Sequence, residues 1–194
     1  MNRTGSLARK TGETDIFVSL DLDGEGLSQV DTGIGFFDHM LSAVAKHGLM
    51  DLTVRVQGDL AVDGHHTVED TGIVLGAALA QALGDKKGIR RVGSCFLPMD
   101  ESLAFCALDI SGRPYLAFDA AFPAEMCGGY ASELTEEFFR AVSVSSGITL
   151  HLKAEGRNTH HMIEALYKAF ARALRDAAAL DPRVKGVPST KGVL

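Results

Sequence analysis

The chain of 194 residues contains no tryptophan, three cysteines and five prolines, and aromatic residues make up only 7% of it. The cysteines form no C-x-x-C pair and are odd in number, so the sequence suggests neither a disulfide framework nor a thiolate metal site and favours a reducing compartment. The first 14 residues lack the apolar core of an export signal, and no window approaches the roughly 18 apolar residues that a membrane span needs. We therefore expect a cytoplasmic protein without membrane contact.

The chain also lacks an excess of basic residues. Its formal net charge is −6 with 23% charged residues. This charge argues against a protein that binds along the phosphate backbone of a nucleic acid, so we expect no nucleic-acid partner. This balance still permits local basic pockets. Hydrophobic residues make up 46% and the mean hydropathy is +0.09, which is enough apolar material for one domain over 1–194.

Hydrophobic periodicity indicates a mixture of strands and helices. Alternating apolar residues predict strands over 15–22, 49–56 and 148–153. Helical spacing predicts helices over 36–46 with Gly48 as C-cap, over 65–83 closed by Gly84, over about 132–144 and over 159–179.

Residues 92–122 form consecutive strand-like runs. These runs are broken by turn residues at 98–100 and 111–114, which favours a meander of neighbouring strands. The residues after Asp181-Pro182 are expected to be irregular.

The order of these elements is repeated once along the chain. Placing residues 38–41 over 136–139 aligns helix with helix, and it also aligns the strand segments 52–55 and 150–153. Two repeats, about 1–90 and 91–180, predict an α+β fold of two pseudo-twofold-related halves, each a β-sheet packed with two helices. The alternative is a pair of unrelated amphipathic helices that share a pattern, but the matching flanking elements favour duplication.

Each repeat contains a His-His-x-x-Glu segment, His65-His66-Thr67-Val68-Glu69 in the first and His160-His161-Met162-Ile163-Glu164 in the second. Each helical residue advances by about 100°, so the first histidine and the glutamate lie about 40° apart, whereas adjacent histidines diverge by about 100°. One histidine with its glutamate can therefore bind one ion, and the neighbouring histidine can reach a second ion shared with the other repeat.

A single histidine on a helix is usually a solvated or hydrogen-bonded residue, but four histidines in duplicated pairs favour metal binding. Imidazole and carboxylate ligands without thiolate suit Mn, Fe, Co, Ni or Zn, and the ligand types alone do not choose among these metals. His39 is expected to be a further ligand because it lies on a helix of the same repeat unit.

Six segments then occur in order from near the first residue to the last few: Arg9-Lys10-Thr11-Gly12-Glu13-Thr14, Gly35-Phe36-Phe37-Asp38-His39-Met40-Leu41, His65-His66-Thr67-Val68-Glu69-Asp70, Ser111-Gly112-Arg113-Pro114, Asn158-Thr159-His160-His161 with Glu164-Ala165, and Pro188-Ser189-Thr190-Lys191-Gly192. This series resembles the imidazoleglycerol-phosphate dehydratase family. Its order over the whole chain makes it far more specific than one short motif.

The resemblance implies a hydro-lyase of histidine biosynthesis that converts imidazole-glycerol phosphate to imidazole-acetol phosphate with two Mn²⁺ ions per active site. It also implies a ribosomal protein S5 domain 2-like fold and a homo-oligomeric shell of 24 chains, with metal ligands drawn from more than one subunit. The residues themselves leave open the metal bound in the cell, the division of ligands between the two ions and the sharing of sites between subunits.

The family's metal ligands match a set of histidines and glutamates: His39, His65, His66, Glu69, His160, His161 and Glu164. Its substrate-contacting positions match Glu13, His39, His47, His65, Glu69, Arg91, Arg113, Ser189, Thr190 and Lys191, with Glu13, His39, Glu69 and Glu164 as the catalytic positions. Glu137 departs from the pattern, because many members have a histidine before the Phe-Phe pair. A carboxylate can still bind manganese, so Glu137 is a further candidate ligand. The alternative is an exposed glutamate beside Glu136.

The hydrogen that this dehydration removes sits on a carbon without a neighbouring carbonyl, so simple enolisation is not available. We expect the substrate's imidazole, deprotonated while both ring nitrogens bind metal, to expel the adjacent hydroxyl and form a diazafulvene-like intermediate. A carboxylate then removes the acidified proton, and the resulting enol becomes the ketone. Glu13 matches the family's acid–base position; without that match it would be read as a surface glutamate near the terminus.

The substrate's phosphate needs fixed positive donors. Arg91, Arg113 and Lys191 supply them, and the alternative for Arg90-Arg91 is a solvated pair. Ser189 and Thr190 add hydroxyl donors, which gives residues 181–194 the role of a phosphate-contacting tail.

Two other classes of function fit the same ligands. The first is hydrolysis of phosphoesters or amides by metal-bound hydroxide, which release of inorganic phosphate would indicate. The second is a non-catalytic protein that stores metal or assembles through it, which would dissociate on chelation and turn over no imidazole substrate.

Overall fold

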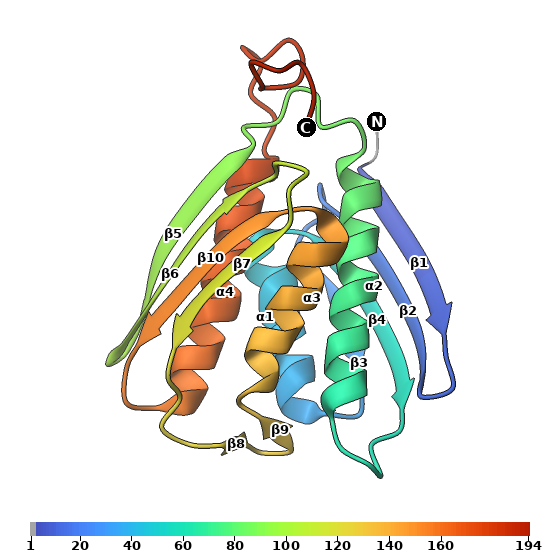
Figure 1. The fold of residues 1–194 in the computed structure, drawn as a ribbon, viewed down its shortest axis with the longest axis vertical. Helices are drawn as coiled ribbons and strands as arrows, with labels where there is room; N and C mark the ends of the chain where they lie inside the picture. The colour runs from blue at the N-terminus through green and yellow to red at the C-terminus, as the bar shows by residue number, and fades with distance from the viewer. Residues whose placement is uncertain (1–2) are drawn as a thin grey trace.

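The computed structural model describes residues 3–194 and consists of two four-stranded sheets with four helices between them (Figure 1). The first half contains β1 (Thr4–Lys10), β2 (Thr14–Asp21), β3 (Ser28–Asp31), α1 (Gly35–Gly48), β4 (Asp51–Gly58) and α2 (His65–Leu83). The second half contains β5 (Val92–Met99), β6 (Ser102–Asp109), β7 (Tyr115–Ala120), α3 (Leu134–Ser146), β10 (Thr149–Glu155) and α4 (Thr159–Ala178). A small hairpin, β8 (Met126–Cys127) and β9 (Tyr130–Ala131), belongs to the second half alone.

The predicted duplication of an α+β unit is confirmed by the strand order. The first sheet runs β1-β2-β4-β3 and the second runs β5-β6-β10-β7, so each strand of one four-stranded sheet has a counterpart in the same place in the other. Thr4 pairs with Asp21 in the first hairpin and Val92 pairs with Asp109 in the second, so counterparts in the two hairpins lie 88 positions apart. In both halves the last strand of the sheet pairs in parallel with the strand that follows a helix.

Two details of the sequence prediction are wrong. The strands over 92–122 do not form a meander, because β10 lies between β6 and β7, antiparallel to the first and parallel to the second. A helix separates β7 from β10 in the chain, and local patterns do not report such a long-range insertion. Gly48 is not the C-cap of α1 either; the left-handed residue is Leu49, with φ of 51°, and its N–H donates to the Ala45 carbonyl.

Close approaches at two glycines set how each outer strand lies against a helix. A side chain at Gly5 on β1 would collide with the carbonyl oxygen of Ala78 on α2. A side chain at Gly93 on β5 would collide with the Ala173 carbonyl oxygen on α4 in the same way. Glycine lets backbone approach backbone at both positions, so α2 packs on the first sheet and α4 on the second.

All four helices begin at the same end of the molecule, and the β1–β2 and β5–β6 turns lie at that end as well (Figure 1). We name it the histidine end, defined by residues 65–69 of α2 and 160–164 of α4. Residues 181–194 lie at the opposite end, which we name the tail end (Figure 1). Within residues 3–194, no helix is both long enough and apolar enough to cross a membrane.

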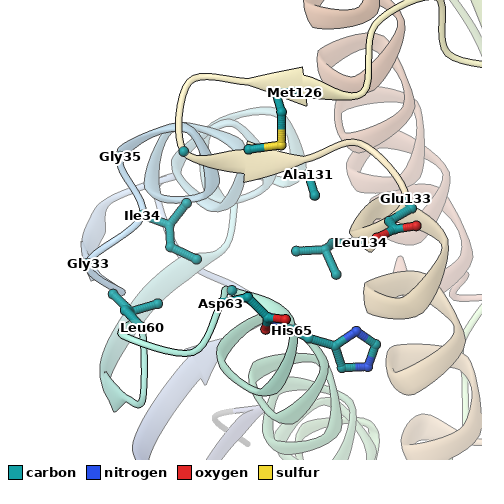
Figure 2. A pocket seen from close by; sticks show the side chains of 12 residues that line it. Gly33, Ile34, Gly35, Leu60, Asp63, His65, Met126, Ala131, Glu133 and Leu134 are labelled. Carbon is teal, nitrogen blue, oxygen red and sulfur yellow. The ribbon is translucent and has the colours of Figure 1, made fainter.

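A cavity of about 620 Å³ opens at the histidine end, where the β8–β9 hairpin faces the first residues of three helices. Figure 2 shows Ile34 and Leu134 lining it and His65 at its edge. Asp63 and Glu133 add carboxylates to this lining. The cavity therefore places a predicted metal ligand beside an apolar surface.

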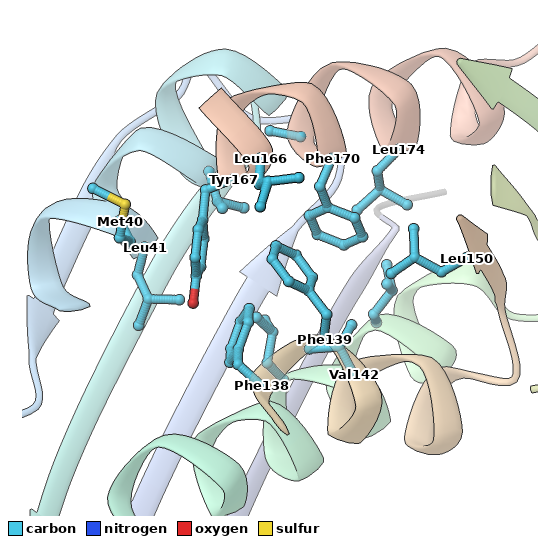
Figure 3. Close-up of a cluster of buried hydrophobic side chains, with 14 of the residues drawn as sticks. Met40, Leu41, Phe138, Phe139, Val142, Leu150, Leu166, Tyr167, Phe170 and Leu174 are labelled. Carbon is cyan, nitrogen blue, oxygen red and sulfur yellow. The ribbon is translucent and has the colours of Figure 1, made fainter. Parts of the chain in front are cut away.

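The core between the sheets contains a cluster of aromatic side chains that joins α3 to α4 (Figure 3). The Tyr167 ring lies 5.2 Å from Phe138 and 4.8 Å from Phe139, between ring centroids. The Tyr167 hydroxyl lies 3.3 Å from that of Tyr130, and burial raises the pKa of Tyr130 to about 12. Aromatic packing with paired hydroxyl groups fixes the helices that carry the candidate ligands.

Candidate functional site

Three predicted ligands from two helices meet at the histidine end. His39 on α1 has its Nε2 atom 3.3 Å from Glu164 Oε2 on α4, and His160 Nε2 lies 3.0 Å from the same oxygen. One donor atom from each of the three residues lies within 4.8 Å of the others, and this is the one such group of three found within residues 3–194. Two imidazoles and a carboxylate at this spacing fit a divalent transition metal.

Glu164 is held as an ionised carboxylate by its surroundings. Its side chain is only 7% exposed, and its second oxygen lies 2.6 Å from the Lys168 ammonium group. Burial raises the pKa of Glu164, but the hydrogen bond and charge of Lys168 outweigh burial and hold the pKa below its usual value. The carboxylate is therefore charged at neutral pH and can neutralise a cation.

The corresponding group in the first half is less complete. His65 Nε2 lies 3.6 Å from Glu69 Oε2 on the half-exposed first turn of α2. Glu137 does not join this pair; its carboxylate lies 3.4 Å from the Arg140 guanidinium on the same helix. The structure thus brings together His65 and Glu69, while Glu137 remains a predicted ligand.

The two histidines of each pair have different partners, as helical geometry predicts. The ring planes of His65 and His66 are 86° apart, and those of His160 and His161 are 85° apart. His66 Nδ1 lies 3.0 Å from Asp59, and His161 Nδ1 lies 2.9 Å from Glu101. Since the carboxylates accept from Nδ1, the Nε2 atoms are left for a ligand.

These carboxylates also change the titration of both histidines. Hydrogen bonding to Asp59 raises the pKa of His66, and hydrogen bonding to Glu101 raises the pKa of His161. The reciprocal effect on Glu101 is large, because the hydrogen bond from His161 lowers the pKa of this carboxyl group to about 2.

Glu13 lies on the turn between β1 and β2. Its side chain is 55% exposed, and its carboxylate lies 3.8 Å from His66 Nε2. The hairpin beneath it is fixed to α2 by Asp70, which accepts a 2.5 Å hydrogen bond from Thr14 and lies 2.6 Å from the Arg9 guanidinium. Glu13 therefore lies beside His66, and its predicted role as the acid–base group stays a prediction.

The predicted phosphate-binding arginines meet at the tail end. Arg91 donates to both carboxylate oxygens of Asp109, at 2.7 and 3.0 Å, and to the Pro188 carbonyl at 2.9 Å. Arg113 lies 3.8 Å from the same Asp109 carboxylate. In the tail, the Lys191 N–H donates to Ser189 Oγ at 3.2 Å, and the side chains of Thr190 and Lys191 are exposed.

His47 occupies a separate place in the last turn of α1. Burial lowers its pKa, and the positive charges of Lys168 and Arg172 lower it further. His47 thus lies among the charged side chains of α4, and Glu164 is the one whose charge raises its pKa.

A single chain does not bring the two predicted parts of the site together. The Arg91 N–H donates to the Ala177 carbonyl in the last turn of α4, whereas His160 lies in the first turn of the same helix. At a rise of 1.5 Å per residue these positions are about 25 Å apart. The three carbons between imidazole and phosphate in the expected substrate do not span this distance.

Four residues that contact predicted site residues were missed by the sequence prediction: Asp59, Glu101, Asp109 and Lys168. Lys168 follows Glu164 by four residues, and this helical spacing was a usable signal. Glu101 occupies the position 88 residues after Glu13, so extending the repeat alignment into the hairpins would have found it. Asp59 and Asp109 gave no local signal, because the contacts that define them join separate elements.

Fold and site together define an internally duplicated α+β protein that presents imidazole and carboxylate groups at one end and guanidinium groups at the other. The family model described as imidazoleglycerol-phosphate dehydratase matches residues 32–174. The chain belongs to the imidazoleglycerol-phosphate dehydratase family, and it is accordingly a hydro-lyase of histidine biosynthesis whose substrate is a phosphorylated imidazole.

The relatives extend over essentially the whole chain. An imidazoleglycerol-phosphate dehydratase of Symbiobacterium thermophilum is 66% identical over 193 residues, covering 99% of this chain and 93% of the relative. That of Acetivibrio thermocellus is 62% identical over 195 residues, covering all of both chains.

Solved structures of this family have the same fold. The enzyme of Staphylococcus aureus subsp. aureus N315 gives a TM-score of 0.84 at 41% identity and covers 92% of this chain and 99% of its own. The Pyrococcus furiosus enzyme, in complex with (S)-C348, gives a TM-score of 0.84 at 35% identity, covering 97% and 100%. The expected fold class, with its two similar halves, is therefore confirmed.

Proposed function

We propose that this chain converts imidazole-glycerol phosphate to imidazole-acetol phosphate in a metal-dependent dehydration with two Mn²⁺ ions per active site. The observation that carries the proposal is the group of His39, His160 and Glu164, whose donor atoms lie within 4.8 Å of one another. Mixed imidazole and carboxylate ligands suit Mn²⁺ and also permit other divalent transition metals.

The proposed ligands divide by the direction in which they face. His39, His160 and Glu164 would bind one ion. His65 and Glu69 would bind the other ion, with Glu137 as a proposed third ligand. His66 and His161 are each held at Nδ1, and their Nε2 atoms, 3.8 Å from Glu13 and 3.7 Å from Asp100, are the proposed donors to metal. When bound, the metal supplies Lewis acidity that favours deprotonation of the substrate's imidazole ring.

Glu13 is proposed as the acid–base group. The electron-rich ring expels the hydroxyl on the adjacent carbon, which leaves as water with the proton that the ring released, and the substrate passes through a diazafulvene-like form. Glu13 then takes the proton from the neighbouring carbon, and the enol becomes the ketone. Its half-exposed carboxylate, 3.8 Å from His66, supports this role because a general base must be free of strong hydrogen bonds and near the ligands.

Arg91, Arg113 and residues 189–191 are proposed to bind the phosphate. The bidentate pair with Asp109 fixes the Arg91 guanidinium, and its bond to the Pro188 carbonyl ties it to the tail. Guanidinium groups match phosphate oxygens, and the hydroxyl groups of Ser189 and Thr190 supply further donors.

The active site is proposed to form between copies of the chain. The separation of about 25 Å between the first turn of α4 and Arg91 supports this, since one chain then offers metal ligands to one site and arginines to another. A shell of 24 chains is the assembly that the family resemblance implies. The cytoplasmic location and the lack of a nucleic-acid partner stay predictions from composition.

The proposal is tested by turnover of imidazole-glycerol phosphate by metal-stripped protein, before and after addition of Mn²⁺, with native mass measured in both states. We expect activity only with metal and a keto product that retains its phosphate. Release of inorganic phosphate would instead indicate a hydrolase. Dissociation on chelation with no turnover in either state would indicate a protein that uses metal only for storage or assembly.

A further inference from the structure

Glu101 is the internal-repeat counterpart of Glu13, although the two carboxylates have different surroundings. The shift of 88 positions between the hairpins places Glu101 over Glu13 and Ser102 over Thr14. Both glutamates therefore lie at the turn of a hairpin, at the histidine end. One duplicated position has produced two carboxylates that face histidines of the two motifs.

Both carboxylate oxygens of Glu101 are engaged in hydrogen bonds. Oε2 accepts from His161 Nδ1 at 2.9 Å. Oε1 accepts from the Asn158 N–H at 2.9 Å, the Arg157 N–H at 3.3 Å and the Ser102 hydroxyl at 2.9 Å. The Asn158 side chain in turn caps α4 by accepting from the His161 N–H at 3.3 Å. Glu101 thus joins the β5–β6 turn to the first residues of α4 and holds the His161 ring.

In the first half a different residue holds the ring of the second histidine, His66. Asp59, in the loop after β4, contacts His66 Nδ1 at 3.0 Å, and Glu13 lies only at 3.8 Å from the other ring nitrogen. In the second half the loop after β10 consists of Gly156, Arg157 and Asn158, and none of these residues has a carboxylate. Because this loop offers no carboxylate to His161, the hairpin carboxylate Glu101 takes the place of the loop carboxylate.

We infer that Glu101 is a positioning residue, which keeps the His161 ring proton on Nδ1 and leaves Nε2 free to bind metal. Consequently each chain contains one hairpin carboxylate for acid–base chemistry, Glu13, and one that orients a ligand, Glu101. This inference rests on the proposed function, in which His161 is a metal ligand.

The test compares Mn²⁺ affinity and turnover in a Glu101→Gln variant. The amide oxygen can still accept from the Arg157 and Asn158 N–H groups, but the amide nitrogen then faces His161 Nδ1. That atom must accept instead of donate, so the ring proton moves to Nε2 and blocks the ligand position. Loss of an orienting carboxylate typically weakens metal binding about 10- to 100-fold, and we expect an increase of this size in the Mn²⁺ dissociation constant.

Mn²⁺ binding is measured from the electron paramagnetic resonance signal of free Mn²⁺. Two further variants serve as the positive and the negative control. Asp59→Asn should weaken Mn²⁺ binding to a similar extent, through His66. Glu155→Gln, at an exposed position on β10 beside Lys153, should leave it unchanged. In Glu101→Gln, we expect turnover at saturating Mn²⁺ to recover to within a few-fold of the unsubstituted protein. A residue with a purely structural role would lower the melting temperature without this recovery.

The ring tautomer provides a readout that needs neither turnover nor metal. Nitrogen-15 spectra of histidine-labelled, metal-free protein, at alkaline pH where the ring is neutral, should show His161 protonated on Nδ1 and, in Glu101→Gln, on Nε2. Equal Mn²⁺ affinity in the Glu101→Gln and Glu155→Gln variants, or an Nε2 proton in the unsubstituted protein, overturns the inference. Absence of Mn²⁺ binding by the unsubstituted protein would instead reject the proposed function, and the tautomer would still decide the role of Glu101.

Discussion

The two halves of the molecule share one topology and differ at the residues that matter for chemistry. The first half has Glu13 on its hairpin turn and a partly buried ion pair beneath it, between Arg9 and Asp70. The second half has the fully engaged Glu101 at the same turn, and the counterparts of the ion pair are Leu97 and Ala165. Duplication thus provides two similar frameworks, and under the proposed mechanism a few substitutions give the second hairpin a role in orienting a metal ligand and the first hairpin a role in proton transfer.

The largest expected effect comes from removing the carboxylate of the first hairpin. Glu13→Gln should lower kcat by about 10²- to 10⁴-fold, because a positioned general base contributes that much, while Mn²⁺ affinity stays unchanged. Glu101→Gln should show the opposite pattern, with weakened Mn²⁺ binding and recoverable kcat. Steady-state kinetics at saturating Mn²⁺ separate the two, and near-normal turnover in Glu13→Gln would remove it from the mechanism.

The free energy of unfolding tests the difference between the Arg9–Asp70 ion pair of the first half and its apolar counterpart in the second. Asp70→Ala leaves the Arg9 guanidinium partly buried without its partner, and we expect a loss of about 2–3 kcal/mol in the free energy of unfolding. The double variant Arg9→Leu with Asp70→Ala copies the second half and should lie within about 1 kcal/mol of the unsubstituted protein. Denaturant titration measures both. A double variant as unstable as the single one would show that the ion pair is not interchangeable with the apolar pair.

The smallest expected effect concerns Glu137, which the repeat alignment places over His39. If the Glu137 side chain turns from Arg140 to the ion bound by His65 and Glu69, Glu137→Ala should weaken the binding of one of the two Mn²⁺ ions about tenfold. Loss of a group that supports a metal site typically has an effect of this size. A matched Glu136→Ala variant removes the neighbouring contact to Arg140 and should leave Mn²⁺ binding unchanged. Calorimetric Mn²⁺ titration resolves the two ions, and equal isotherms for both variants would leave Glu137 as a surface residue.

Much of the fold follows from local sequence patterns. The helix over 65–83 was predicted with its observed bounds, because its apolar spacing is regular and Gly84 ends it. The duplication was also visible, since matching motifs recur with matching flanks. The position of β10 between β6 and β7 was not predictable from neighbouring residues, because strand partners that are distant in sequence are chosen by packing in the whole sheet.

The site was predicted unevenly for a related reason. Helical geometry predicts that adjacent histidines meet different partners, and in both pairs they do. It does not give the identity of the groups that meet them from other elements, so Asp59 and Glu101 were missed. Nor does it give the distance between Arg91 and His160, which depends on the direction in which α4 runs between the two ends.

The central claim is that metal ligands and phosphate-binding residues of one active site come from different copies of the chain. Co-expression of a His160→Ala chain with an Arg113→Ala chain, each carrying its own tag, tests this directly in doubly purified oligomers. Each variant alone should be nearly inactive, whereas random co-assembly of equal amounts should restore about a quarter of the sites and a corresponding share of turnover. Mixed oligomers no more active than the separate variants would show that both groups must come from one chain, which would contradict the shared site.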